Sequence, residues 1–229
     1  MRTAVADLGE RLVDLLGLEH QPVAITFRDS VPADGKFFDA PMSESTPDGR
    51  SGRVAAPCVF WMHAHQRTFH TMPVDHGNCS VGRFTHGMAS AADILDKADV
   101  GALLDVGWVT MEAFADVAAL SWRPAAITYG PLNEADAAPD LVLLRLNPRQ
   151  MMEINDAVNV EFSGKPQCQI LPRAADGQVF AASMGCALSR ARTGMGDDEL
   201  TCAFPGSRLR ELVRNLEHVV AADRAVAVF

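Results

Sequence analysis

The chain has 229 residues, of which 48% are hydrophobic, 21% charged and 7% aromatic, a composition typical of a globular protein that excludes wholesale disorder. The formal net charge of -9 argues against a nucleic-acid binder, which needs a basic face, and against an anionic membrane surface as a partner. No stretch of about 18 apolar residues predicts a membrane span. The N-terminal residues alternate apolar and acidic positions, unlike a signal peptide, so we expect a cytoplasmic protein.

Hydrophobic spacing and turn residues predict a chain in which helices and strands alternate. The predicted helices cover residues 3–17, 58–68, 91–120 with a break near Gly107, 147–158 and 207–223, and the predicted strands cover 22–27, 124–129, 140–146 and 178–183. Residues 41–54 are rich in serine, proline and glycine, which predicts a surface loop. Asn147 followed by Pro148 is typical of a helix start, and Ser207 is the expected cap of the last helix.

Two segments of the first half recur in the second. Residues 22–27 (PVAITF) are similar to residues 124–129 (PAAITY). The pattern C-x-x-x-R-x-x-x-G-M begins at Cys79 and again at Cys186. Self-similarity of this kind indicates an internal repeat.

A third match completes the repeat. Cys58 and Cys168 each stand just after a proline-containing segment, and they fit the same alignment. Three matches in one order predict two pseudo-repeated α/β half-units, residues 1–105 and 106–229, that form one compact domain by internal duplication. The expected fold is α+β, with a mixed or antiparallel sheet and flanking helices.

The five cysteines predict a metal site rather than a disulfide framework, because their number is odd and their spacing wide. Four of them form two pairs in the repeat, and packing about a pseudo-two-fold axis would bring these four thiols together: Cys58, Cys79, Cys168 and Cys186. Four converging thiolates suit either a [4Fe-4S] cluster or a structural zinc ion, although no pair has C-x-x-C spacing. The fifth, Cys202, is expected to pack in the core.

Arg83 and Arg190 each follow a repeated cysteine by four residues, which on a helix places both side chains on one face. We expect these arginines either to act on the sulfur site and its substrate or to form a salt bridge between the halves. The glycines that close the two motifs, Gly87 and Gly194, are expected at helix ends, with the methionines after them packed inside.

Histidines concentrate in the first half, where five of the seven lie between residues 63 and 86. His76 stands three residues before Cys79, and the place of His86 is taken by Thr193 in the second motif. Function often survives in one half of a duplicated fold, so His76 and His86 are candidate acid–base groups. The alternative is a scatter of surface and partly buried histidines without a chemical role.

Several of these segments match a known family in the same order. They are Leu16-Gly17-Leu18 before Pro22-Val23-Ala24, Cys58 at a helix start, the Cys79 segment, the Cys168 region, Ser183-Met184-Gly185-Cys186 with Arg190, Asp197-Asp198-Glu199-Leu200, and Pro205. On these residues the chain resembles the prokaryotic domain of unknown function 169 family over nearly its whole length. The resemblance implies that the four paired cysteines belong to a shared pattern, and it implies no particular activity. The histidine-rich stretch departs from the family pattern.

The first functional hypothesis is an iron–sulfur enzyme, an oxidoreductase or lyase, with a [4Fe-4S] cluster on the four paired cysteines. With three ligating cysteines, an open iron would act on a small polar substrate, which Arg83 and Arg190 would orient while His76 or His86 transferred protons. With four, electron transfer is the simpler role, and a ferredoxin-like electron donor is the expected partner.

Two other classes of function stay open. One is a non-catalytic protein with a structural zinc ion or a small-molecule site. The other is an enzyme in which Cys79 is the nucleophile beside His76. The absence of G-x-G-x-x-G, Walker A and G-x-S-x-G sequences counts against nucleotide cofactors and serine hydrolysis. An acidic, pseudo-symmetric protein is also compatible with a homodimer.

Overall fold

The computed structural model describes residues 3–39 and 55–227. Its strands are β1 (Val23–Arg28), β2 (Phe69–Thr71), β3 (Ala126–Pro131), β4 (Leu141–Leu146), β5 (Val160–Ser163), β6 (Phe180–Ser183) and β7 (Leu200–Pro205). Its α-helices are α1 (Ala4–Leu16), α2 (Pro57–Ala64), α3 (Ser80–Thr85), α4 (Ala98–Asp105), α5 (Met111–Ala115), α6 (Pro148–Ala157), α7 (Ile170–Gly177), α8 (Ala187–Thr193) and α9 (Leu209–Val226). Short 3-10 turns are η1 (Pro73–His76), η2 (Leu132–Glu134), η3 (Gln167–Gln169) and η4 (Gly206–Arg208).

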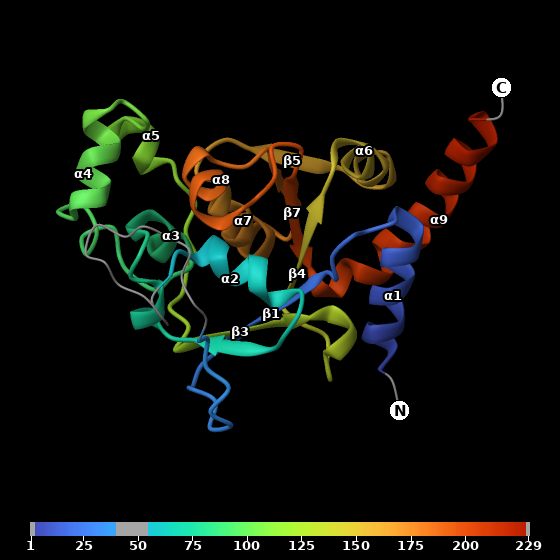
Figure 1. Ribbon diagram of the computed structural model, residues 1–229, viewed down its shortest axis with the longest axis horizontal. Helices are drawn as coiled ribbons and strands as arrows, with labels where there is room; N and C mark the ends of the chain where they lie inside the picture. Colours follow the sequence, from blue (N-terminus) through green and yellow to red (C-terminus); the bar gives the residue numbers. More distant parts are fainter. Residues whose placement is uncertain (1–2, 40–54, 228–229) are drawn as a thin grey trace.

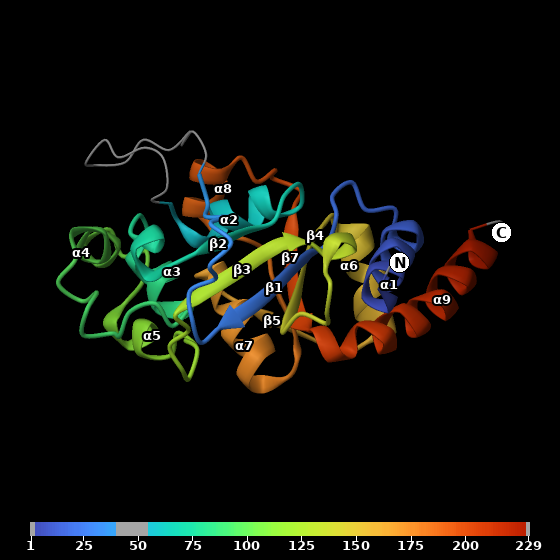
Figure 2. The ribbon, with the colours of Figure 1, turned by 90° about the horizontal axis from the view of Figure 1, so that it is seen from below.

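The seven strands form one open sheet in the order β2-β3-β1-β4-β7-β6-β5. Every neighbouring pair is antiparallel except β5 and β6, which are parallel. Helices flank the sheet on both sides (Figures 1 and 2). The expected α+β class with a mixed sheet is therefore confirmed, while the loop predicted over residues 41–54 lies outside the described residues.

The core lies on both faces of the sheet because side chains alternate along each strand. Val23 and Ile25 of β1 join the cluster that contains α2 and α7, whereas Ala24 joins the opposite cluster, which contains α1, α6 and α9. A third, smaller cluster joins α3 to α4 and α5. In Figure 1 these last two helices lie at the opposite end of the molecule from α1 and α9. In the described part of the chain, no helix is both long and apolar enough to cross a bilayer.

Local sequence chemistry explains several helix boundaries. The Asn147 side chain accepts from the Gln150 backbone N–H at 2.9 Å, and Gln150 Oε1 accepts from the Asn147 N–H at 2.8 Å, so α6 begins with a capping box. Gly107, with φ of 67°, separates α4 from α5, as the break predicted there requires. Gly87 and Gly194 have φ of 70° and 73° just after α3 and α8, which confirms their expected place at helix ends.

Three helix predictions are wrong in extent. Of residues 91–120, only α4 and α5 are helical, while residues 91–97 form bends and turns and the chain after α5 is not helical. The other two are wrong at their ends. The helix expected over residues 58–68 stops at Ala64, because the chain must turn to lay β2 against β3, and Thr68 lies against Gly130 there. Ser207 does not cap the last helix, since it sits inside η4 and α9 begins at Leu209 without a side-chain cap. That turn forms because the Gly206 N–H donates to the Asp140 carbonyl, which ties the end of β7 to the start of β4.

The connectivity has an internal symmetry. In the first part of the chain the order is β1-α2-β2-α3, followed by α4 and α5 and then β3. In the second part the order is β4, followed by α6 and β5 and then α7-β6-α8-β7. Read outward from the β1–β4 pair, the strand order is β1-β3-β2 on one side and β4-β7-β6 on the other. The two outward series therefore use equivalent strands with the same antiparallel pairing.

Candidate functional site

A small cavity of about 30 Å³ is enclosed by the beginnings of α2, α3 and α8 and by η3. All four cysteines of the predicted metal site line it: Cys58, Cys79, Cys168 and Cys186. They come from four separate segments, so only the tertiary fold brings them together. All five cysteines of the chain are thiols. A cavity of this size has room for about one or two water molecules.

Each of these cysteines lies at or near the start of a helix. Cys79 caps α3 and its Sγ accepts from the Gly82 N–H at 3.4 Å, while Cys186 caps α8 and its Sγ accepts from the Ser189 N–H at 3.3 Å. Cys58 is in the first turn of α2, and Cys168 lies in η3, which leads directly into α7. Helix N-termini carry partial positive charge, so all four cysteines lie where backbone N–H groups begin a helical segment.

The thiol of Cys168 is the most buried of the four, with 8% exposure. Burial raises the pKa of Cys168 well above its ordinary value, and the nearby sulfurs of Cys79, Cys186 and Cys58 raise it further, while a hydrogen bond from Thr85 acts against them. Cys168 is therefore close enough to the other three sulfurs for each of them to act on its thiol. Without a cation among them, Cys168 is a neutral thiol at pH 7; a bound cation would favour its thiolate.

The chemistry of this donor set fits a thiophilic metal. Four thiolates suit zinc or an iron–sulfur cluster, whereas magnesium and calcium take oxygen ligands. As the side chains stand, residues 3–39 and 55–227 contain no group of three or more His, Cys, Asp or Glu side chains arranged to hold a metal ion. The four sulfurs thus share a cavity without forming a ligand sphere as they stand.

The rest of the cavity wall has one polar pair and an apolar side. Gln167 and Ser189 face the cysteines, and the Gln167 amide Nε2 lies 2.6 Å from Ser189 Oγ. Leu103 and Trp108, from α4 and the loop after it, line the cavity with the leucine of α8, and Lys165 Nζ lies 4.8 Å from the Trp108 ring centre. Our sequence reasoning missed these residues, although Gln167 directly precedes Cys168.

His76 and His86 are fully buried next to one another, with ring centres 5.7 Å apart. His76 Nε2 is 2.9 Å from Thr71 Oγ1, and His86 Nδ1 is 2.8 Å from the Gly82 carbonyl. Burial lowers the pKa of His76 well below its usual value, helped by the charges of His86 and Arg83. Burial also lowers the pKa of His86, to about 4. Both rings are therefore neutral at pH 7.

A single residue connects this histidine pair to the cysteines. Thr85 Oγ1 donates to the Gly82 carbonyl at 2.9 Å, lies 3.1 Å from His86 Nδ1, and is near enough to Cys168 to lower the pKa of its thiol. Neither histidine lines the cavity itself. In the described structure, His76 Nδ1 and His86 Nε2 have no hydrogen-bond partner, so His76 is not paired with Cys79 as a nucleophile–base couple would require.

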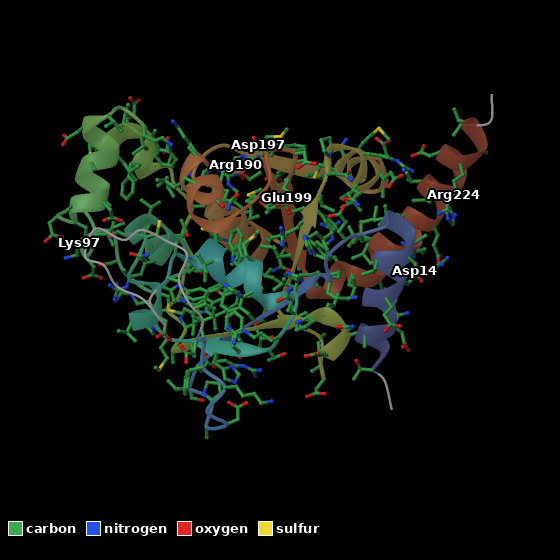
Figure 3. The ribbon with its side chains drawn as sticks, viewed as in Figure 1. Asp14, Lys97, Arg190, Asp197, Glu199 and Arg224 are labelled. Carbon is green, nitrogen blue, oxygen red and sulfur yellow. The ribbon has the colours of Figure 1, made fainter. Side chains whose placement is uncertain are left out.

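The two candidate arginines have different surroundings, and neither lines the cavity. Arg83 is half-buried on α3, and its Nε finds no partner in the described residues. Arg190 donates to the carbonyls of Met184, Gly196 and Glu199, at 2.7 Å and 2.9 Å for the first and last. Figure 3 shows Arg190 and Glu199 close together near α8. Arg190 therefore holds the two ends of the α8 segment in place.

Cys202 is separate from this site. It lies on β7 with 0% exposure, in the cluster on the face of the sheet that α1, α6 and α9 cover. Burial raises the pKa of its thiol to about 12. Its position agrees with the expected core packing.

The close contact between α2 and α3 at the cavity gives a direct test. A Cβ added at Gly82 would lie 2.7 Å from Pro57 Cδ and 3.4 Å from Cys79 Sγ. We expect Gly82→Ala to lower the free energy of unfolding by about 2 kcal/mol, because the two helices must separate. Urea unfolding measures this effect. The control is Gly101→Ala in α4, where nothing lies within 4 Å of the new Cβ and the change is expected to be neutral or stabilising; equal losses in both variants would contradict the prediction.

Together, the fold and the site define an α+β protein with one mixed sheet and a cavity lined by four cysteine thiols at helix starts. The chain belongs to the DUF169 family, described as uncharacterised ArCR, COG2043, whose model matches residues 11–215. The matched range contains all the cavity cysteines. No curated protein and no solved structure is significantly similar to the chain.

Proposed function

We propose that the protein is an iron–sulfur protein that holds a [4Fe-4S] cluster on Cys58, Cys79, Cys168 and Cys186. The observation that carries this proposal is that four cysteines from four separate segments line one cavity. When bound, such a cluster supplies electron transfer or, with one iron open, Lewis-acid polarisation of a small polar substrate. We further propose that the protein is an enzyme of this kind.

Within this proposal the chain's own groups have distinct tasks. Backbone N–H groups of Gly82 and Ser189 donate to the sulfurs of the two helix-capping cysteines, and hydrogen bonds of this kind adjust the reduction potential of a cluster. Thr85 lies between Cys168 and His86, and the neutral His76–His86 pair is the proposed route for protons. The geometry does not favour a substrate-orienting role for Arg190, whose guanidinium is engaged by three carbonyls.

A structural zinc ion is the second candidate. The observation in its favour is the small size of the cavity, about 30 Å³, which a single ion fits with less rearrangement than a cluster does. Tetrahedral Cys₄ coordination is common for structural zinc. In this case the protein would be a non-catalytic module, and the buried histidines would have packing roles.

We also propose that the chain arose by internal duplication. The support is that α2-β2-α3 and α7-β6-α8 each present one cysteine near the start of each helix. In this proposal β1 corresponds to β4 and β3 to β7, so the two halves would meet near residues 131–141 and not at residue 105. It makes the similar segments at 22–27 and 124–129 neighbours in the sheet, not equivalent strands.

The proposed site also suggests where the protein acts and which molecules it meets. Reduced thiols fit a cytoplasmic location, a small polar molecule is the proposed substrate, and a ferredoxin-like protein is the proposed electron donor. The acidic chain and its symmetric plan are compatible with a homodimer.

Anaerobic purification tests the proposal directly. We expect brown protein with an absorbance shoulder near about 400 nm and close to four iron and four sulfide per chain, as thiolate–iron charge transfer and cluster stoichiometry require. The measurements are metal and sulfide analysis together with the absorbance spectrum. Colourless protein with one zinc per chain would replace the cluster by the second candidate, and protein without metal that binds neither would refute both.

A further inference from the structure

A polar pocket lies on the face of the sheet opposite the cysteine cavity, at β1, β2 and β3. Side chains alternate along each strand, so Arg28, His70 and Thr128 share this face while their neighbours in the strands pack into the cluster that contains α2 and α7. In Figure 2, β1 and β3 face the viewer and none of the described α-helices crosses them. The three side chains line a pocket of about 360 Å³, to which the segment after β3 also contributes.

These side chains and Asp34 form one continuous chain of hydrogen bonds. Asp34 Oδ1 lies 2.9 Å from His70 Nε2, and His70 Nδ1 lies 2.9 Å from Thr128 Oγ1. Arg28 Nε–H donates to the same threonine oxygen at 3.0 Å. The His70 side chain is 6% exposed and Thr128 is half-buried, so the ring is held at both nitrogens beside a hydroxyl that lines the pocket.

The donors and acceptors of this chain fix the positions of its protons. An ionised carboxylate only accepts, and the hydrogen bond with His70 lowers the pKa of Asp34, so His70 Nε2 carries the proton that lies between them. In the neutral ring Nδ1 is then an acceptor, and the Thr128 hydroxyl donates to it. Arg28 only donates, so it takes a lone pair of the hydroxyl oxygen. Hydroxyl, imidazole and carboxylate thus stand in the order of a nucleophile, its base and the group that orients the base.

The segment that carries Asp34 does not need these side-chain bonds to stay in place. Its backbone is already joined to β2, because the His70 N–H donates to the Lys36 carbonyl at 2.7 Å and the Phe38 N–H donates to the His70 carbonyl at 3.0 Å. The side-chain bonds are therefore an addition to a contact that the backbone makes by itself. Anchoring of the segment does not account for a hydroxyl placed on the far nitrogen of the ring.

We infer that this pocket is an esterase site in which Thr128 is the nucleophile, His70 the general base and Asp34 the residue that positions the base. Thr128 Oγ1 forms a bond to the carbonyl carbon of the ester while its proton passes to His70 Nδ1. The bond from that carbon to the alcohol oxygen then breaks, and the alcohol leaves with the proton from His70. Arg28 keeps a positive charge beside the oxygen from which the proton departs.

The second half of the reaction restores the site. Water attacks the acyl group on Thr128, and its proton passes to His70 Nδ1. The bond from the acyl carbon to Thr128 Oγ1 breaks, the oxygen takes the proton back from His70, and a carboxylic acid is released. No oxidant, reductant or metal takes part, so this activity is independent of the proposed metal site.

The lining of the pocket favours a small, uncharged ester. Two basic side chains, Arg28 and Lys36, are among the described lining residues. Three acidic ones offset them: Asp34, Glu134 and Asp136. Neither sign of charge dominates, and the alanines and prolines of the segment after β3 supply an apolar surface for the acyl group. A volume of about 360 Å³ is within the range of small-molecule sites.

The test is hydrolysis of p-nitrophenyl acetate by the full-length protein, followed by the absorbance of p-nitrophenolate. We expect saturable turnover. Thr128→Val keeps the shape of the side chain without the hydroxyl and should lower kcat/KM by about 100-fold or more, while Asp34→Asn should lower it by about 10-fold or more. Thr128→Ser keeps a hydroxyl and should retain activity. Mass spectrometry of protein stopped with acid during turnover should find an acetyl group on Thr128.

Thr26→Val is the matched control. Thr26 lies directly opposite Thr128 in the register of β1 and β3 and on the same face, but outside the chain of hydrogen bonds, so kcat/KM should not change. Equal activity of Thr128→Val and the unsubstituted protein would refute the site, as would acetylation found only on Lys36 or on cysteines. Absence of saturable hydrolysis by the unsubstituted protein would refute it as well, and none of these results would affect the proposed metal site.

Discussion

Replacing Cys186 by serine is expected to remove nearly all of the bound metal, with a fall in affinity of more than about 100-fold. A hydroxyl is a poor ligand for thiophilic metals, and losing one of four ligands costs more than losing a supporting hydrogen bond, which itself costs about 10–100-fold. Metal analysis and the charge-transfer absorbance of protein purified anaerobically measure the loss. Cys79→Ser should behave in the same way.

These two positions are the best ones for the test because their substitution spares the fold. Cys79 and Cys186 cap α3 and α8 through their side chains, and serine is itself a favoured cap residue, so both helices keep an acceptor for their first N–H groups. Urea unfolding without metal should therefore change little. Cys202→Ala is the matched control, since Cys202 lies in the opposite core cluster and its loss should leave the metal content unchanged. Retention of normal metal content by Cys186→Ser would refute the site.

The shared cavity of the four cysteines could be predicted from the sequence because the motif that begins at Cys79 and Cys186 occurs twice, each time at the start of a helix. The pattern that begins at Cys79 and Cys186 encodes a cap, one or two helical turns and a glycine that ends the helix. Gly87 and Gly194 take the left-handed conformation that this reading requires, and the methionines after them are each 5% exposed. Helix caps and helix ends of this kind can be predicted from sequence because the residues that form them lie within about ten positions of one another.

Other features depend on contacts between distant segments, and no local signal reports them. Thr85 lies near Cys168 because α3 packs beside η3. Gln167 lies near Ser189 because η3 packs beside α8. The three-residue strand β2 is too short to show an alternating pattern and exists through its pairing with β3. Three acidic residues in a row at 197–199 are typical of a solvated turn, and Asp197 and Asp198 are exposed in one. Glu199, in contrast, forms a largely buried ion pair with Arg145 at 2.6 Å, which no local pattern indicates.

The second large effect is a loss of stability in mild acid through His76 and His86. The folded-state pKa of His86 is lowered to about 4, and that of His76 is lowered well below the usual value, because both rings are fully buried. Between pH 6.5 and about 4, the unfolded chain therefore binds protons that the native state does not, and the free energy of unfolding falls as the pH falls. The contribution of His86 alone amounts to about 3 kcal/mol at and below pH 4, and it is absent well above pH 6.5.

Urea unfolding at several pH values between 7.5 and 4.5 measures this loss. His86→Phe keeps an aromatic ring beside Trp61. We expect it to lower the number of protons taken up on unfolding by up to one, and so to reduce the fall in the free energy of unfolding over this pH range. His218→Gln, on the exposed side of α9, is the control and should keep the full slope. If His86→Phe and the unsubstituted protein lose stability equally with acid, the buried ring is not the cause.

A bound metal adds its own pH dependence, since protons compete with it for the thiolates. The histidine effect is therefore best compared in a Cys186→Ser background, where the metal is expected to be lost while α8 keeps its cap. In that background, the proteins with His86 and with His86→Phe should still differ in the slope of the unfolding free energy against pH. The difference arises from burial of the histidine ring and not from the cavity. With Cys186 intact, both the protein with His86 and the His86→Phe variant should show an additional acid-dependent loss of unfolding free energy. The pH at which that step occurs reports how strongly the metal holds Cys168 as a thiolate against the burial that raises its pKa.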